Sequence, residues 1–301
     1  MKPFTPMSPI LTDELPHVEG WGYQLKWDGY RTIAMVDQGQ VELYSKRMLF
    51  KNAKYPDLVE ALSQLKGTFL LDGELVVMDA ETNRPSFQKM QQRDKLTDPR
   101  LITRGAERAP VQYIIFDLLQ LGQEDLRKRP FGERHERLKA LAADWGPPFF
   151  LTDLFEDGET LWAWVNANGW EGVVSKKLSS PYREGKEHHD WLKKKTMLRL
   201  EIEAVGILMK EGRVSSLVMR RDGEYLGRVS SGLNDKWRRW LFDLPADRAF
   251  TDYFTSLPED LKGMKVRWLN KTFTCEVSGQ EITEGGAVRH PKLLSLGGNL
   301  L

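Results

Sequence analysis

Residues 21–36 read WGYQLKWDGYRTIAMV, and the fold of the N-terminal part of the chain is built outward from this stretch. Its apolar runs predict two strands, Tyr23 to Lys26 and Arg31 to Val36, joined by a tight turn that the glycine allows. A partly buried lysine near cationic neighbours can lose its proton and act as a nucleophile, with Asp28 positioning it and Arg31 meeting a phosphate or sugar. A salt-bridged hairpin turn explains the same residues equally well, so this stretch alone leaves both interpretations open.

The rest of the first two thirds of the chain alternates predicted strands with predicted helices. Apolar or alternating runs predict strands at Val41 to Ser45, Thr68 to Met78, Val111 to Leu119 and Gly172 to Lys176. Apolar residues at helical spacing predict helices at Tyr55 to Leu65, Phe131 to Ala143 and Gly158 to Asn168. Helices that pack on sheets indicate an α+β fold.

The last third has a different pattern. Short strands with glycine-rich turns and one helix are predicted at Ile202 to Met209, Ser216 to Arg220, Tyr225 to Val229, Asp235 to Phe242 (the helix), Lys265 to Leu269 and Phe273 to Ser278. Such a series is typical of a small β-barrel. We therefore expect two domains, residues 1–198 and 199–301, joined by a short hinge near Lys195 to Leu200.

Composition narrows the class of protein. The chain has 301 residues, 41% of them hydrophobic, which is enough to bury two hydrophobic cores. Its formal net charge is only +1, so any surface that binds nucleic acid must be a local patch of positive charge. Cys275 is the single cysteine, which excludes internal disulfides and fits a reducing compartment. The sequence has neither a signal-peptide pattern nor a run of about 20 apolar residues, so we expect a cytoplasmic protein with no membrane partner.

Further motifs follow the lysine stretch in order. They are Tyr44-Ser45-Lys46 with Tyr55-Pro56-Asp57-Leu58, Leu71-Asp72-Gly73-Glu74-Leu75, Ser86-Phe87-Gln88 with Gln91-Gln92-Arg93, Phe116-Asp117-Leu118-Leu119, Pro130-Phe131-Gly132-Glu133-Arg134, Glu171-Gly172-Val173-Val174-Ser175-Lys176 and Trp191-Leu192-Lys193-Lys194-Lys195. With them the chain resembles the covalent nucleotidyltransferases, and within these the bacterial ATP-dependent DNA ligases of the end-joining ligase D type. The resemblance spans most of the chain. It implies an ATP-grasp-like nucleotidyltransferase domain, with antiparallel sheets flanked by helices, followed by an OB-fold barrel.

The resemblance also implies the reaction. Lys26 would attack ATP, form a lysine–AMP phosphoramidate, release pyrophosphate and pass AMP to the 5′-phosphate of a nick in duplex DNA. Glu74 would hydrogen-bond the ribose, Phe116 would stack on adenine, and Lys193 and Lys195 would grip the α-phosphate. The remaining nucleotide-binding positions are Arg31, Lys46 and Lys176.

A divalent cation completes the implied site. Glu171, together with Glu74, would hold Mg²⁺ or Mn²⁺, because oxygen ligands favour these ions over zinc. The cation and the lysines would neutralise charge around an in-line phosphoryl transfer.

Taken singly, these residues have plainer explanations. Glu74 ends an apolar strand and fits a solvated strand terminus, Phe116 fits a core position, and a run of three lysines fits a solvated face. Strand alternation would point Lys193 and Lys195 to one side and Lys194 to the other, which suits two lysines that converge on one phosphate.

The chain departs from the family at three places. Where the family generally has Ser-Arg-Asn-Gly, this chain has Ser45-Lys46-Arg47-Met48, so Lys46 or Arg47 takes the place of an arginine fork. Gln24 stands where a glutamate is usual two residues before the nucleophile. Gly297-Gly298-Asn299-Leu300 stands where the family has a closing Arg-x-Asp-Lys string that orients the leaving pyrophosphate. We therefore expect either slow transfer of AMP from ATP to Lys26, or Arg289 and Lys292 in the role of that string.

Nicked duplex DNA is the expected partner. The candidate phosphate contacts of the barrel are Lys210, Arg213, Arg220, Arg221, Arg228, Lys236, Arg238 and Arg239. The lysine motif begins only about 25 residues into the sequence, so we expect this chain to lack the large helical DNA-binding domain that some ligases place before it. A monomer would clamp the duplex with its own two domains, moving about the hinge, or would use a DNA-end-binding repair protein.

Two other functions remain open at this point. RNA ligases and capping-type nucleotidyltransferases share the lysine chemistry, although the motifs around Phe87, Arg93 and Glu133-Arg134 favour a DNA ligase. A non-catalytic nick-binding module is the other alternative, motivated by the altered closing string.

Overall fold

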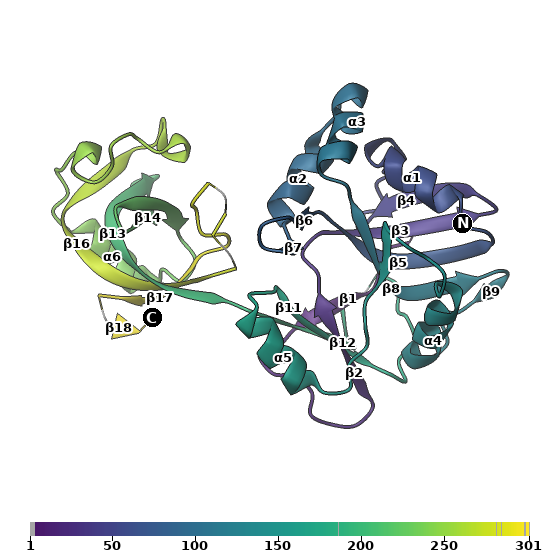
Figure 1. Cartoon of the computed structure of the whole chain (residues 1–301). Helices are drawn as coiled ribbons and strands as arrows, with labels where there is room; N and C mark the ends of the chain where they lie inside the picture. The colour runs from purple at the N-terminus through teal and green to yellow at the C-terminus, as the bar shows by residue number, and fades with distance from the viewer. Residues whose placement is uncertain (1–3, 186, 281, 284, 298, 301) are drawn as a thin grey trace. The chain divides into compact units, whose positions relative to one another are not determined.

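The computed structural model describes residues 4–185, 187–280, 282–283, 285–297 and 299–300. The chain divides into two compact units, Met1–Thr196 and Met197–Leu301 (Figure 1). In the described part of the chain, no helix combines the length and the apolar character needed to cross a membrane.

Unit 1 contains two sheets whose strands come from distant parts of the sequence. The larger sheet has the order β10-β8-β5-β3-β4, with β9 paired to β8, and its strands are β3 (Tyr30–Asp37), β4 (Gln40–Ser45), β5 (Thr68–Val76), β8 (Gln112–Leu121), β9 (Glu124–Asp125) and β10 (Phe149–Leu151). The smaller sheet has the order β1-β12-β11-β2, and its strands are β1 (Ser8–Leu11), β2 (Trp21–Lys26), β11 (Gly172–Lys177) and β12 (Glu187–Lys195). A separate ribbon pairs β6 (Met78–Asp79) with β7 (Arg84–Pro85).

This topology rejects one interpretation of the opening stretch. β2 and β3 follow each other along the chain but belong to different sheets, so residues 21–36 do not form a hairpin. The turn after Lys26 instead carries the chain from one sheet to the other. The lysine therefore lies where the two sheets meet.

The helices of unit 1 cover its sheets (Figure 1). They are α1 (Pro56–Ser63), α2 (Phe87–Lys95), α3 (Pro99–Arg108), α4 (Phe131–Leu141) and α5 (Gly158–Ala167), with a 3₁₀ turn at Asn52–Lys54. The side chains of Ser86, Asp98 and Asp157 cap α2, α3 and α5 by accepting a backbone N–H from the first turn. The sequence patterns do not predict helices α2 and α3, because their sequences are largely polar and contain few apolar residues.

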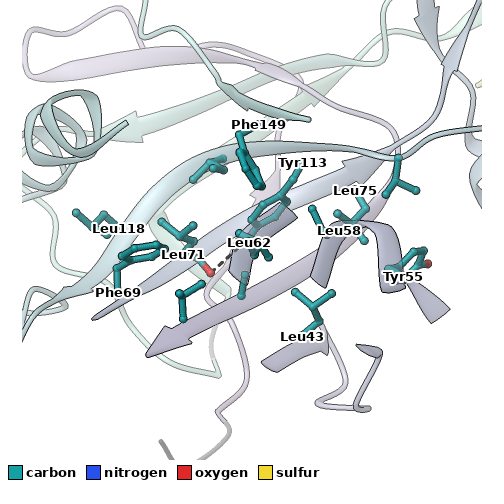
Figure 2. Packing of buried hydrophobic residues seen from close by; sticks show 14 of the residues in the cluster. Leu43, Tyr55, Leu58, Leu62, Phe69, Leu71, Leu75, Tyr113, Leu118 and Phe149 are labelled. Carbon is teal, nitrogen blue, oxygen red and sulfur yellow. Dashed lines mark hydrogen bonds between the residues drawn. The ribbon is translucent and has the colours of Figure 1, made fainter. Parts of the chain in front are cut away.

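The main core of unit 1 lies between one face of the larger sheet and α1 (Figure 2). Leu58 and Leu62 of α1 are fully buried with Leu71 of β5 and Tyr113 of β8. The Tyr113 hydroxyl donates to the carbonyls of Thr32 at 3.0 Å and Leu71 at 3.3 Å, so its polar end is satisfied within the core. A second cluster, which includes Ile33, Leu70, Leu119 and Trp191, draws its members from both sheets and fixes one sheet against the other.

In its described residues, unit 2 forms a six-stranded antiparallel sheet with one helix. The order is β15-β14-β13-β16-β17-β18, and the elements are β13 (Leu198–Lys210), β14 (Arg213–Arg221), β15 (Glu224–Val229), α6 (Asp235–Phe242), β16 (Val266–Gly279), β17 (Lys292–Leu296) and β18 (Asn299–Leu300), with 3₁₀ turns at Phe250–Asp252 and Glu259–Leu261. Within the ranges that the structure describes, the strand ladder does not close into a barrel.

One strand of unit 2 differs from its prediction in an informative way. The two strands predicted at Lys265 to Leu269 and Phe273 to Ser278 are a single strand, β16. Its register against β13 jumps from Ala204↔Phe273 to Gly206↔Trp268, so the polar residues between the two predicted strands form a bulge and do not end the strand.

Candidate active site

Three neighbouring strands of the smaller sheet bring the predicted nucleophile to its partners. In the antiparallel ladder Gly172 of β11 lies opposite Lys26 of β2 on one side and opposite Lys195 of β12 on the other. Glu171 immediately precedes this glycine, so its carboxylate lies between the two lysines. A Cβ atom at position 172 would lie 2.1 Å from the carbonyl oxygen of Lys194, so this close approach requires glycine.

Glu171 bridges the two lysines. Lys26 Nζ donates to Glu171 Oε2 at 2.6 Å, and Lys195 Nζ lies 2.9 Å from Glu171 Oε1. The carboxylate side chain is only 11% exposed, against 20% for Lys26 and 25% for Lys195. This limited solvent access strengthens the interaction relative to a surface ion pair.

The lysines of β12 alternate as the strand prediction requires. Lys194 turns away from Glu171, and its ammonium lies 4.3 Å from the ring centre of Trp162 on α5. Lys193 faces the cavity in front of Lys26. Burial lowers the pKa of Lys193, Glu187 opposes this effect, and the positive charges of Lys26, Lys46 and Lys195 lower it further.

A cavity of about 670 Å³ opens in front of Lys26. This volume lies within the range of small-molecule sites, roughly 300 to 1,000 Å³. Both sheets contribute to its wall, and among the lining residues are Gln24, Lys26, Arg31, Lys46, Arg47, Glu74, Phe116, Val174, Lys176, Trp191 and Lys193. Most of the predicted nucleotide-binding positions therefore lie on one cavity, although they come from separate parts of the chain.

Glu74 lies on β5, opposite Arg31 of β3, and is partly buried. Desolvation raises the pKa of its carboxyl to about 8, while Lys26 and Arg31 pull it down and the negative charges of Glu171 and Asp28 push it up. The electrostatic coupling places Glu74, Glu171 and Asp28 in one neighbourhood around Lys26. Asp28 is partly buried in the turn that follows the lysine.

Arg31 makes contacts that the sequence did not reveal. Its Nε and Nη2 atoms donate to the two carboxylate oxygens of Asp72 at 2.5 and 2.6 Å, and Nη2 also donates to the carbonyl of Met7 at 3.1 Å. The Tyr182 hydroxyl donates to Asp72 Oδ2 at 2.6 Å. The Arg31 guanidinium thus binds groups of the protein, whereas the sequence predicted that it binds a phosphate or sugar. The guanidinium carbon also lies 4.6 Å from the centre of the Phe116 ring.

Lys176 is enclosed by aromatic side chains and is 2% exposed. Its ammonium lies 4.6, 4.4 and 4.2 Å from the ring centres of Phe116, Phe131 and Trp191, and it donates to the Phe116 carbonyl at 3.1 Å. Desolvation lowers its pKa to about 7, against the opposing effect of Asp117. The sequence predicted a nucleotide-binding lysine here but gave no sign of this enclosure.

The segment with the altered Ser-Arg-Asn-Gly string forms a tight turn at the mouth of the cavity. Ser45 accepts the backbone N–H of Met48 at 2.8 Å and donates its own to the Leu49 carbonyl at 3.0 Å. Met48 holds a φ of +58°, a left-handed conformation that glycine adopts without strain. Lys46 and Arg47 both line the cavity, so either cation can take the place of the arginine that the family has there.

Glu171 and Glu74 are the predicted metal ligands. Within the described ranges, no cluster of three or more His, Cys, Asp or Glu side chains could hold a metal ion by itself. Glu171 and Glu74 offer carboxylate oxygens, the donors that Mg²⁺ prefers. Such an ion commonly binds one or two carboxylates and takes its other ligands from phosphates and water, so the pair fits this arrangement.

The closing segment belongs to unit 2. The Thr283 backbone N–H donates to the Ala287 carbonyl at 2.9 Å, and Ile282 bridges to Val288. Gly297, with a φ of +58°, leads into the turn between β17 and β18, and Leu296 pairs with Asn299. Gly298 of the replaced Arg-x-Asp-Lys string lies outside the described residues.

Three kinds of comparison identify related proteins. A sequence profile described as "ATP dependent DNA ligase domain" matches residues 9–195. The multifunctional non-homologous end joining protein LigD of Pseudomonas aeruginosa is 33% identical over 296 residues, which cover 93% of this chain and 34% of that protein. DNA ligase C2 of Mycolicibacterium smegmatis is 36% identical over 186 residues, which cover 60% of this chain and 52% of that protein. The chain thus spans between a third and a half of the length of these relatives.

Solved structures agree with the sequence comparisons. The crystal structure of the ligase domain from M. tuberculosis LigD resembles this chain with a TM-score of 0.56 at 28% sequence identity. The matched region covers 97% of this chain and 94% of the chain in that structure. A mycobacterial DNA ligase D complexed with ATP and MES matches 96% of this chain and 94% of that chain with a TM-score of 0.54 at 29% identity. Because the profile match covers more than half of its residues, the chain belongs to the ATP-dependent DNA ligase domain family.

Proposed function

We propose that this chain seals nicks in duplex DNA, using ATP and a lysine–AMP intermediate. The observation that carries the proposal is that Glu171 pairs with both Lys26 and Lys195, and that Lys26 and Lys193 line one nucleotide-sized cavity. An amine nucleophile, a carboxylate and further ammonium groups are the side chains that nucleotidyl transfer requires.

The first step follows from these groups. Neutral Lys26 Nζ forms a bond to the α-phosphorus of ATP as the bond to the pyrophosphate oxygen breaks. Pyrophosphate leaves with the electron pair, and the nitrogen releases one proton to solvent and keeps one N–H in the phosphoramidate. Lys193 and Lys195 stabilise the charge on the α-phosphate. Glu171 and Glu74 would hold Mg²⁺ or Mn²⁺, which would supply further neutralisation of phosphate charge.

The rest of the cavity would hold the nucleoside. Phe116 and Val174 provide apolar surfaces for the base, and Glu74 accepts a ribose hydroxyl. Lys46 or Arg47 at the mouth contacts the phosphate of AMP or of the nick. Arg31 and Lys176 line the same cavity, and both lie close to the Phe116 ring. AMP then passes to the 5′-phosphate, and attack by the 3′-hydroxyl closes the nick and releases AMP.

We further propose that residues 1–198 are the adenylation domain and residues 199–301 an OB-fold domain that binds DNA. The support for the second part is a bent sheet of antiparallel strands with many cations, including Arg213 and Arg221 on β14. Several relatives are described as end-joining proteins, which supports a role in DNA repair and a DNA-end-binding repair protein as partner. We propose that the chain acts as a monomer in the cytoplasm.

Labelling with α-³²P-ATP and Mg²⁺ tests the proposal. Wild-type protein is expected to form an acid-labile AMP adduct that Lys26→Ala abolishes, while Lys177→Ala, at an exposed position at the end of β11, retains it. Sealing of nicked DNA should follow, and pre-adenylated nicked DNA should be sealed without ATP. An adduct that persists in Lys26→Ala, or sealing that does not require adenylation, would show the proposal to be wrong.

A further inference from the structure

Two large apolar side chains are exposed to water on the turn beside the cavity. Leu49 and Phe50 are consecutive in the sequence, and each is 59% exposed. Exposed apolar area costs free energy, and apolar side chains that gather on a surface commonly mark a contact with a partner. We name this pair the apolar tip.

Hydrogen bonds hold the apolar tip in a fixed turn. The Leu49 backbone N–H donates to the Ser45 hydroxyl at 3.1 Å, and the Leu49 carbonyl accepts the backbone N–H of Ser45 at 3.0 Å. After the tip, the Lys51 ammonium donates to both carboxylate oxygens of Asp94 on α2, at 2.8 and 3.1 Å. The turn is therefore tied down on both sides of the tip, which opposes a collapse of the two apolar side chains onto the protein surface.

Positive charge accompanies the apolar tip. Lys46 and Arg47 precede it on the same turn, are exposed, and line the cavity together with Leu49. Burial lowers the pKa of Lys193, and the positive charge of Lys46 lowers it further, so the turn lies within electrostatic reach of the lysine proposed to bind the α-phosphate. Apolar side chains next to cations match a partner that offers apolar rings and sugars between phosphates, which is the chemistry of DNA.

The proposed reaction brings the break in the DNA to this turn. The 5′-phosphate of the nick must reach the AMP carried by Lys26, so the broken strand has to enter the cavity that Leu49 also lines. The nucleotides on either side of the break then lie next to the apolar tip. The two apolar side chains can contact their bases and sugars, while the cations contact the phosphates.

We propose that Leu49 and Phe50 form a wedge that presses against the base pairs at the nick and thereby distinguishes nicked from continuous duplex DNA. The inference rests on the proposed function and deepens it, because it names the part of the chain that recognises the break. Apolar wedges in DNA-binding proteins partly unstack neighbouring base pairs and bend the duplex. One strand is not joined at a nick, so the duplex deforms there at a lower cost than where both strands are continuous. The wedge therefore strengthens binding to a nicked site and contributes little to binding of an intact one.

Binding of nicked and continuous duplexes of the same sequence tests the inference. Both carry the fluorescent base 2-aminopurine at the nick position, the nicked duplex has a 3′ end without a hydroxyl, and all proteins carry Lys26→Met, so neither an adduct nor sealing interferes. The Lys26→Met protein is expected to bind the nicked duplex about tenfold tighter than the continuous one, with a rise in 2-aminopurine fluorescence as the base unstacks. Addition of Leu49→Ser or Phe50→Ser should reduce this preference by about fivefold and suppress the rise in fluorescence.

Two further variants serve as controls. Leu49→Met keeps an apolar side chain at the tip and should retain the preference. Leu101→Ser makes the same chemical change as Leu49→Ser at another exposed position, on α3, and should also leave the preference unchanged. Equal binding of the two duplexes, or a preference that both serine variants of the tip retain, would overturn the inference. So would a wild-type dimer that Phe50→Ser converts to a monomer, because the tip would then be an interface between two copies of the chain.

Adduct labelling of the wild type with α-³²P-ATP keeps the two proposals separate. If the adduct forms but the preference for the nick does not depend on Leu49 or Phe50, the wedge alone is rejected. If no adduct forms but the serine variants lose the preference, the proposed function fails while the wedge is upheld.

Discussion

Glu171 accepts a hydrogen bond from Lys26 at 2.6 Å, although 145 residues separate the two along the chain. Its other oxygen lies 2.9 Å from Lys195 Nζ. One carboxylate therefore balances two ammonium groups beside a cavity that a third lysine, Lys193, also lines. This relationship fixes the proposed nucleophile in the ladder of β2, β11 and β12.

Glu171→Gln should impair both chemistry and stability. Removal of the negative charge leaves the lysines to repel each other and removes the proposed ligand for Mg²⁺, so adduct formation should fall by about 100-fold. The free energy of unfolding should fall by roughly 1–3 kcal/mol, because a partly buried ion pair loses one partner. Adduct labelling and urea denaturation measure the two effects. Glu81→Gln, at an exposed position, serves as the control.

Substitutions of the three lysines of β12 should have different effects, according to the face of the strand on which each side chain lies. Lys193→Ala and Lys195→Ala should each slow adduct formation by about 10- to 100-fold, because they remove charge next to the phosphates. Lys194→Ala should leave the rate within about twofold and cost roughly 0.5–1 kcal/mol of stability through the lost Trp162 contact. Single-turnover labelling of the three variants provides the comparison, and a rate defect in Lys194→Ala as large as the others would refute the assignment.

Arg31→Lys distinguishes a positioning residue from a phosphate ligand. The bidentate pairing with Asp72 cannot be reproduced by a lysine, so the free energy of unfolding should fall by roughly 2–4 kcal/mol along with adduct formation. A ligand that only meets phosphate would lose activity without losing stability. Chemical denaturation in the absence of nucleotide decides the matter, and Arg47→Lys at the cavity mouth should leave the stability within about 0.5 kcal/mol.

Lys176 should give the folded protein a distinctive pH dependence. Its pKa is about 7 in the folded chain against an ordinary value of 10.5, so between these values the unfolded chain binds more protons. Stability contributed by this group therefore rises with pH across that window, with a slope of up to about 1.4 kcal/mol per pH unit. Urea denaturation at pH 7 to 9.5 should show this slope in wild type and a smaller one in Lys176→Met. Equal slopes in the two proteins would contradict the assignment.

Met48→Gly should stabilise the protein. Position 48 holds a φ of +58°, which costs an ordinary side chain roughly 1–2 kcal/mol and glycine little. Glycine also has the greater conformational entropy in the unfolded chain, which offsets part of this gain. The free energy of unfolding is therefore expected to rise by about 0.5–1 kcal/mol. Arg47→Gly, next to it, has no positive φ to relieve and should be neutral or destabilising. Thermal unfolding of both variants tests this contrast, and a loss of stability in Met48→Gly would refute it.

Local patterns in the sequence predicted much of the fold. The strands at β2, β3, β4, β8 and β11 and the helix α6 follow their apolar periodicity closely, because these segments bury one face or both. The polar helices α2 and α3 and the strand β12 did not stand out in the same way. Their formation depends on capping residues such as Ser86 and Asp98, and on pairing with strands that are distant in sequence.

The sequence by itself determined that Lys26 stands at a strand end within an ordered set of ligase motifs, and that Lys194 turns away from its neighbours. Only the tertiary structure decided which groups meet. Arg31 binds Asp72 and Lys176 is enclosed by three rings, because these contacts arise when two separate sheets pack together. Periodicity along the chain reports which face is buried, whereas strand order and register determine what that face contacts.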